Sequence, residues 1–237
     1  MLQIERQEQI LDLLSQTPAL RIGQIAAALY TSEATVRRDV AILEQKGLLR
    51  RVYGGVTLKK EDMPLELRSQ EHAAAKEEIA RMAAALIKDG QTVFLDSSST
   101  AQHLLPYLTR FRDLTVVTNS HRAVEVLATA KLRLICTGGD LITRNMAFVG
   151  RVAEATLENL CPDIAFISSQ GVDERGEITD ASEEETALRR VALRRAVRTV
   201  FLCDGSKVGK RFFHRLGMLS EMDEIIVDET FPKALLP

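Results

Sequence analysis

Short apolar runs alternate with helical segments along residues 92–228 of this chain. The apolar runs are TVFL (92–95), LTVVT (114–118), LRLIC (132–136), DIAFIS (163–168), TVFLC (199–203) and EIIVD (224–228). Apolar residues recur at helical spacing between most of them, over 100–110, 121–130, 151–159 and 183–197. Unbroken apolar strands joined by helices are typical of a parallel sheet that helices cover on both faces. The sequence therefore predicts an α/β fold whose larger, C-terminal domain is a doubly wound, mostly parallel sheet.

Composition excludes several classes of protein. The chain has 237 residues, of which 46% are hydrophobic and 27% charged, so it can bury a core. No run approaches the ~18 apolar residues of a membrane helix, and the charged start MLQIERQEQI is unlike a secretory signal. Cys136, Cys161 and Cys203 are dispersed, without the clustered ligands of a zinc site, and are expected to be reduced and buried. We therefore expect a cytoplasmic protein with no membrane partner and no metal.

Charge is distributed unevenly. Residues 1–60 contain nine Lys or Arg and six Asp or Glu, a net charge of +3, whereas the remainder carries −5. A basic head on an acidic body favours a polyanionic partner for the head.

The head has the pattern helix, helix, helix, hairpin. Residues 4–15 and 22–29 have helical spacing, Ser32 is a good N-cap for a third helix, and Gly47 ends that helix. LLRRV and VTL around YGG predict two short strands. The third helix should bury Val36, Val40 and Leu43. This pattern predicts a winged helix-turn-helix domain.

The buried stripe turns the paired arginines of SEATVRRDV toward other faces, as in a recognition helix that enters the major groove. Arginine can contact guanine with two hydrogen bonds or clamp a phosphate. A pair of arginines is also common on a solvated helix, so the prediction depends on the surrounding pattern. Of Arg50 and Arg51, which alternate along a strand, only one should face DNA. The candidate DNA-binding residues are Ser32, Thr35, Arg37, Arg38, Arg50, Arg51, Tyr53 and Gly54.

Domain boundaries follow from these patterns. Residues 1–58 are the predicted DNA-binding domain and residues 59–74, which are charged and contain Pro64, the predicted linker. Residues 75–237 are the predicted effector-binding and oligomerisation domain. A predicted helix runs from near His72, at the end of the linker, to 88–90.

Polar residues follow each predicted parallel strand, where ligands bind in open α/β sheets. The segment DSSST (96–100) between a strand and a helix could cradle a phosphate, and Lys207 could supply a cation. Each such loop could instead hold only helix caps and turns. The candidate effector-binding residues at these strand ends are Asp96, Ser97, Ser98, Ser99, Thr100, Thr118, Asn119, Ser120, Gly138, Gly139, Asp140, Gly171 and Lys207. Only one of the three acids at 183–185 can face the pocket, and we select Glu185.

No catalytic set is evident, because His72, His103, His121 and His214 are scattered. We therefore expect neither catalytic residues nor a cofactor.

The stretch SEATVRRDVAILEQKGLLRRVYGGV resembles the DeoR family of bacterial transcription regulators, and FLDSSST, LTVVTNS, TGGDL, AFISSQGVD and DGSKVG follow in the family's order. The resemblance implies a sugar-phosphate-sensing domain, similar in fold to ribose-5-phosphate isomerase, fused to a DNA-binding head. It also implies that Arg189, which stands where the family usually has Lys, is an effector-binding residue and affects the charge or selectivity of the pocket. Other departures from the family pattern are Arg21, Tyr30, Tyr53 and Ser98.

Together these patterns predict a repressor of a sugar or polyol operon that a phosphorylated sugar releases from operator DNA. Such a mechanism needs a homodimer or homotetramer, because two heads must meet two half-sites. Two other hypotheses remain at this stage. One is a sugar-phosphate isomerase-like enzyme with an accessory head, and the other is a DNA-architectural protein that binds no ligand.

Overall fold

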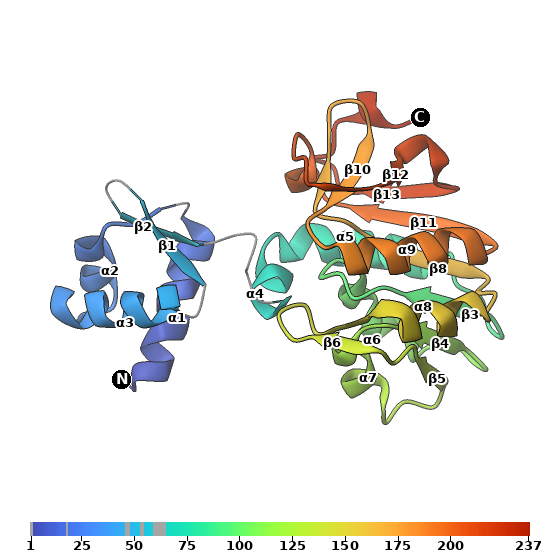
Figure 1. Ribbon diagram of the computed structural model, residues 1–237, viewed down its shortest axis with the longest axis horizontal. Coiled ribbons are helices and arrows are strands. Elements are labelled where there is room, and N and C mark those ends of the chain that lie inside the picture. Colours follow the sequence, from blue (N-terminus) through green and yellow to red (C-terminus); the bar gives the residue numbers. More distant parts are fainter. Residues whose placement is uncertain (1, 18, 46–47, 53–54, 59–64) are drawn as a thin grey trace. The chain divides into compact units, whose positions relative to one another are not determined.

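The chain forms two compact units, Met1–Glu71 and His72–Pro237 (Figure 1). The structure is a computed structural model that describes residues 2–17, 19–45, 48–52, 55–58 and 65–237. Candidate DNA-binding residues Tyr53 and Gly54, the predicted helix stop Gly47 and residues 59–64 of the predicted linker lie outside the described residues.

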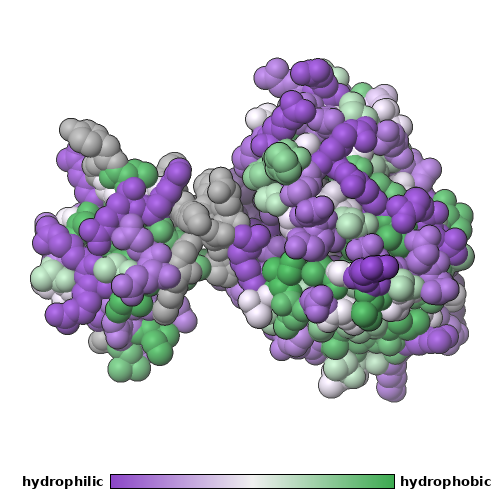
Figure 2. Space-filling model, in the orientation of Figure 1, coloured by the Kyte–Doolittle hydropathy of each residue, from purple (hydrophilic) through white to green (hydrophobic). Residues whose placement is uncertain are grey.

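The first unit is the predicted helix-turn-helix with its wing. Its elements are α1 (Gln3–Gln16), α2 (Ile22–Ala28), α3 (Glu33–Gln45), β1 (Leu49–Val52), β2 (Gly55–Leu58) and α4 (Leu65–Gln70). Val36, Val40 and Leu43 of α3 are buried against Ile10 of α1 and Ile25 of α2, so the predicted stripe is confirmed. Figure 2 shows hydrophilic residues over most of the visible surface of this unit, with hydrophobic residues at the N-terminal end of α1.

The wing is an antiparallel β1–β2 pair that is tied to the segment before α2. Leu20 and Val56 exchange two backbone hydrogen bonds, of 3.0 and 2.8 Å. A Cβ on Gly55 would lie 2.6 Å from the Leu20 carbonyl oxygen, so this position requires glycine for the bridge to Leu20. Helix α4 and the start of α5 fall in the segment that the sequence suggested as a linker, and Leu67 of α4 packs on the core of the first unit.

The second unit is described without a gap and contains a six-stranded parallel sheet in the order β13-β11-β8-β3-β4-β5. Its strands are β3 (Thr92–Leu95), β4 (Thr115–Thr118), β5 (Arg133–Cys136), β8 (Ile164–Ile167), β11 (Arg198–Cys203) and β13 (Glu224–Val227). The helices are α5 (Ala73–Ala84), α6 (Leu105–Leu108), α7 (His121–Leu127), α8 (Gly150–Glu158) and α9 (Glu183–Arg195). All six predicted strands are confirmed. The four inner strands, β3, β4, β8 and β11, are mostly buried, as their continuous apolar runs indicate.

The sheet separates two cores. Successive side chains of a strand point to opposite faces, so Val93 and Leu95 pack with helices α5, α6 and α7, while Phe94 packs with α8 and α9. The predicted cover of helices on both faces is therefore confirmed (Figure 1).

Several elements differ from the sequence-based expectation. The predicted helix over 100–110 is split into a 3₁₀ turn, η2 (Ala101–Leu104), and the short α6, which has Pro106 in its first turn. Two antiparallel additions were missed: the hairpin β6 (Asp140–Ile142) and β7 (Ala147–Val149), and a sheet of β9 (Gly171–Val172), β10 (Glu177–Asp180) and β12 (His214–Met218). Short 3₁₀ turns complete the unit at η3 (Gly205–Lys207), η4 (Leu219–Glu221) and η5 (Lys233–Leu235). These strands are short and partly polar, so their pairing is set by tertiary contacts.

Two further expectations can be compared with the structure. Cys203 is buried, but Cys136 is only partly buried and Cys161 is exposed, so the prediction of three buried cysteines was wrong. Cys161 follows α8 at the surface, where its sulfur accepts a hydrogen bond from Arg195. Within the described residues, no helix combines the length and the apolar character needed to cross a bilayer.

Candidate DNA-binding surface and effector site

Helix α3 presents its arginines outward. The Ser32 hydroxyl accepts the Thr35 amide at 3.2 Å, which confirms Ser32 as the N-cap, and also bonds the Thr35 hydroxyl at 2.8 Å. Arg37 and Arg38 are both exposed, as the buried stripe beneath them predicts. Arg37 pairs with Glu33 one turn earlier, whereas Arg38 pairs with no carboxylate among the described residues.

Asp39 completes the Arg-Arg-Asp triplet but points the other way. It is fully buried and accepts hydrogen bonds from Arg6 and Gln3 of α1. Burial opposes its ionisation, but the hydrogen bonds from Arg6 and Gln3 outweigh burial, so the pKa of Asp39 is lowered. Asp39 therefore ties α3 to α1 and sets the orientation of the helix that carries the arginines.

The wing adds two more cations. Arg50 and Arg51 are both exposed on β1, and Arg51 pairs with Glu44 of α3 at 3.1 Å. Like Arg37, Arg51 is thus matched by a nearby exposed carboxylate.

The carboxyl ends of the parallel strands bring most of the effector candidates together in the second unit. Asp96, directly after β3, accepts the Ser168 amide at the end of β8, and the Ser97 hydroxyl donates to Glu185 at 3.1 Å. The Asn119 side-chain amide after β4 donates to Ser97 at 3.3 Å. One network thus joins the ends of three strands and the start of α9.

The buried loop of residues 97–100, called the cradle below, follows β3. Within residues 65–237, the backbone amides of Ser97, Ser99 and Thr100 donate to no other protein group, although all three residues are buried. The Lys207 ammonium donates to the Thr100 and Ser168 hydroxyls at 2.8 and 2.6 Å. Unpaired amides beside a fixed cation suit an anionic group.

Lys207 also lies 3.7 Å from Asp204. Burial would raise the pKa of Asp204, but the charge of Lys207, a hydrogen bond from Ser206 and the charges of Lys76 and His72 lower it. Lys76, from α5, is itself buried, so two lysines lie within electrostatic reach of this carboxylate.

Arg189 occupies the centre of a carboxylate cluster. Its guanidinium is 6% exposed and lies 2.8 Å from Asp96, 3.0 Å from Asp180 and 3.5 Å from Glu185. Burial would lower the pKa of Arg189, but the charges of Asp180, Asp96 and Glu185 outweigh burial and raise it. Glu185 is the one member of the 183–185 acids that faces inward, as predicted.

Two family models cover nearly the whole chain. The DeoR-like helix-turn-helix domain matches residues 6–62, and the DeoR C terminal sensor domain matches residues 71–229. The chain belongs to the DeoR family. It is a DNA-binding transcriptional regulator, and the expected resemblance is confirmed.

Full-length relatives support the family assignment. The chain is 33% identical over 239 residues to the HTH-type transcriptional regulator GolR of Listeria innocua, covering 99% of this chain and 94% of the relative. It is 32% identical over 231 residues to the lactose phosphotransferase system repressor of Staphylococcus aureus, covering 94% and 91%. It is 30% identical over 232 residues to the regulator YulB of Bacillus subtilis, covering 96% and 90%.

Solved structures show weaker likeness. Ribose 5-phosphate isomerase A from Methanocaldococcus jannaschii matches with a TM-score of 0.44 and 19% identity, over 58% of this chain and 55% of that one. Translation initiation factor eIF-2B from Pyrococcus horikoshii matches with a TM-score of 0.49 and 14% identity, over 97% and 90%. Neither likeness bears on the activity of this regulator.

Some effector candidates of this DeoR-family chain have structural roles. The Thr118 hydroxyl donates to the Leu95 carbonyl at 2.7 Å and accepts the Ser120 amide, while Ser120 caps α7. The Ser98 hydroxyl accepts the Ala101 amide, as a cap does. For these three hydroxyls, the alternative of caps and turns describes the structure better.

Four further candidates lie outside the hydrogen-bonded network. Asp140 is exposed, and its carboxylate lies beside Gly150 at the start of α8. A Cβ on Gly171 would lie 2.5 Å from the Lys210 carbonyl, so that glycine permits close packing of two backbones. Gly138 and Gly139 have φ of 65° and 106°, and a Cβ on Gly139 would lie 2.3 Å from the Val149 carbonyl oxygen. Backbone geometry therefore explains why glycine stands at these three positions.

Sequence reasoning missed residues that join the network from other elements. Asp180 ends β10, Ser168 follows β8, Asn145 lies in the β6–β7 turn and donates to Glu185, and Lys76 lies on α5. Ser168 could have been found from its position after a parallel strand. Asp180 and Asn145 belong to the antiparallel additions that the sequence did not predict.

Proposed function

We propose that this regulator represses a sugar or polyol operon and that a phosphorylated sugar, bound at the carboxyl edge of the large sheet, releases it from DNA. The observation that carries the proposal is the cradle at residues 97–100, which has unpaired backbone amides and whose Thr100 hydroxyl accepts a hydrogen bond from the ammonium of Lys207. The phosphate would accept from the Ser99 and Thr100 amides and pair with Lys207. The neighbouring carboxylates and Asn119 would bind hydroxyl groups of the sugar.

Asn119 offers an acceptor for such a hydroxyl. Its side chain is 3% exposed, its Nδ2 donates to Ser97 and to the Phe148 carbonyl, and its Oδ1 has no partner within the second unit. A buried acceptor without a donor costs free energy, and a sugar hydroxyl would satisfy it.

On the DNA side, Thr35, Arg37 and Arg38 would contact the operator from α3. Of the two wing arginines, Arg51, which pairs with Glu44 of α3, would face the DNA. Two heads must reach two half-sites, so we propose a homo-oligomer whose arrangement changes when the sugar binds. Coupling between such sites is typically about 1–3 kcal/mol. The proposed location is the cytoplasm, where a bacterial regulator meets its operator.

We do not propose an enzyme. A general base works best when its pKa is near the working pH, but the pKa of Asp204 is lowered. The carboxylates of Asp96, Asp180 and Glu185 are paired with Arg189 in a buried cluster. The relatives are transcriptional regulators.

The test is a thermal-shift screen of the full chain against phosphorylated sugars and the matching free sugars. A ligand at a hundred times its Kd should stabilise the second unit by about 2.7 kcal/mol. Any phosphorylated compound that acts should also release the protein from DNA. Lys207→Gln should remove the shift, whereas Lys131→Gln, at an exposed lysine of the same unit, should retain it. Equal shifts from free and phosphorylated sugars, or a normal shift in Lys207→Gln, would contradict the proposal.

A further inference from the structure

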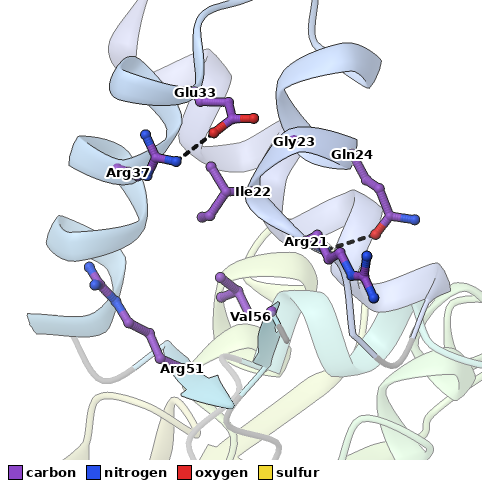
Figure 3. A pocket seen from close by; sticks show the side chains of 9 residues that line it. Arg21, Ile22, Gly23, Gln24, Glu33, Arg37, Arg51 and Val56 are labelled. Atoms are coloured by element: carbon purple, nitrogen blue, oxygen red, sulfur yellow. Dashed lines mark hydrogen bonds and ion pairs between the residues drawn. The ribbon is translucent and has the colours of Figure 1, made fainter. Parts of the chain in front are cut away.

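A hollow of about 640 Å³ lies between α2, α3 and the wing of the first unit. Three arginines line it: Arg37 from α3, Arg51 from β1 of the wing, and Arg21 from the position directly before α2. Figure 3 shows Arg37 and Arg51 on one side, Arg21 on the opposite side, and Ile22 and Val56 between them. Cations thus surround an apolar floor.

The hollow is held open by the backbone. The two hydrogen bonds between Leu20 and Val56 join the segment before α2 to β2, so the floor residues on either side are fixed relative to each other. Gln24 accepts the Arg21 amide at 2.8 Å, which fixes the backbone from which the Arg21 side chain extends. The site is therefore built before any ligand arrives.

The three arginines differ in what neutralises them. Arg37 pairs with Glu33 and Arg51 with Glu44, whereas the exposed guanidinium of Arg21 pairs with no carboxylate among the described residues. The Glu33 carboxylate also lies against α2, where a Cβ on Gly23 would be 3.0 Å from its Oε1. Glu33 thus places a negative charge inside a hollow whose other charged lining residues are cations.

We propose that this hollow binds a backbone segment of operator DNA, with Arg21 as its main phosphate contact and Glu33 as an internal competitor for Arg37. The inference rests on the proposed DNA-binding function and adds a residue and a site to it. Val56 is only 1% exposed, so Ile22 is the part of the apolar floor that can contact the deoxyribose between two phosphates, and arginine suits the phosphates themselves. Arg38 is exposed beside Arg37 on α3, so the hollow adjoins the proposed DNA-binding surface.

Binding requires little rearrangement. The side chains of Arg37 and Glu33 are 60% and 50% exposed, and ion pairs between exposed side chains are weak. A phosphate can therefore replace the Glu33 carboxylate on Arg37 at small cost. Removing that carboxylate should strengthen binding to any duplex, because phosphate contacts carry no sequence information.

The experiment measures binding of the full chain to a mixed-sequence duplex of about 30 base pairs, which spans two half-sites one turn apart. Fluorescence anisotropy is recorded between about 50 and 200 mM salt. Arg21→Gln should weaken binding by about tenfold and reduce the slope of log affinity against log salt by about 1 for each head engaged. Arg21→Lys, which keeps the charge, should recover most of the affinity.

Glu33→Gln should act in the opposite direction and raise affinity several-fold. Lys131→Gln makes the same charge change as Arg21→Gln at an exposed position of the second unit and should leave affinity unchanged. Circular dichroism should show every variant folded, because the Arg21 side chain is exposed and Glu33 is half-exposed.

Wild-type affinity in Arg21→Gln, or equal weakening by Lys131→Gln, would overturn the phosphate contact while leaving the DNA-binding proposal intact. Weaker binding by Glu33→Gln would show that Glu33 contacts DNA favourably and would overturn its role as competitor. A wild-type protein that binds no duplex would overturn the DNA-binding proposal together with this inference.

Discussion

Replacing Arg189 by Met should destabilise the second unit strongly. The guanidinium is 6% exposed and pairs with Asp96, Asp180 and Glu185, whose side chains are 1%, 2% and 4% exposed. Met keeps most of the aliphatic packing but leaves three buried carboxylates without their cation. Removing one partner from a buried ion pair typically costs about 3–5 kcal/mol. Because three buried carboxylates would lose their cation at once, we expect a value near the upper end of that range.

Differential scanning calorimetry of the full chain is the suitable assay, because two units need not unfold as one transition. A loss of about 3–5 kcal/mol should lower the transition of the second unit by roughly 6–20 °C, at about 2–4 °C per kcal/mol for a domain of this size. The transition of the first unit should not move and serves as an internal reference. Arg189→Lys keeps the charge but not the fork of donors, and should fall between wild type and Met.

Arg194→Met is the matched control on the same helix. Arg194 is 59% exposed and lies 3.4 Å from an exposed carboxylate of Glu158, so its loss should cost less than about 1 kcal/mol. If Arg189→Met cost no more than Arg194→Met, the carboxylates would not depend on Arg189 for their charge balance, and the electrostatic reasoning would fail.

Three further results are expected from calorimetry. Asp39→Asn should lower the free energy of unfolding of the first unit by about 2 kcal/mol near pH 7. Because the pKa of Asp39 is lowered in the fold, its contribution is present above the ordinary carboxyl pKa and is lost as the pH falls through the folded-state value. The wild type and the variant should therefore converge in stability in acid. Tyr30→Gly should raise the free energy of unfolding of the same unit by about 1 kcal/mol, since Tyr30 has φ of 50° and is 98% exposed. A decrease would mean that the Tyr30 ring makes a stabilising contact. Gly139→Ala should cost more than about 2 kcal/mol, as its Cβ would meet the Val149 carbonyl at 2.3 Å, and a neutral effect would show that the backbone yields there.

The helix-turn-helix and the parallel sheet were predictable because their signals are local. The spacing of Val36, Val40 and Leu43 alone determines which side of α3 is buried and therefore that Arg37 and Arg38 face outward. The continuous apolar runs identify the six parallel strands in the same way.

The effector candidates were only partly separable from the sequence. A serine after a strand can cap a helix, as Ser120 does, or leave its backbone amide unpaired, as Ser99 does in the cradle. The two cases look the same in the sequence. Cys161 was misassigned for a related reason, because nothing local shows that the turn after α8 lies at the surface.

The sequence by itself determined the helix-turn-helix, the six parallel strands, the family and the outward presentation of the recognition-helix arginines, because hydrophobic periodicity acts over one or two turns or strands. Only the tertiary structure decided which charges meet. It brought Asp180 from an unpredicted strand to Arg189, Arg6 to Asp39, and Arg21 to the hollow shared with Glu33. These meetings depend on distances between segments far apart in the chain, and the strength of an ionic contact depends on the burial that only the folded packing provides.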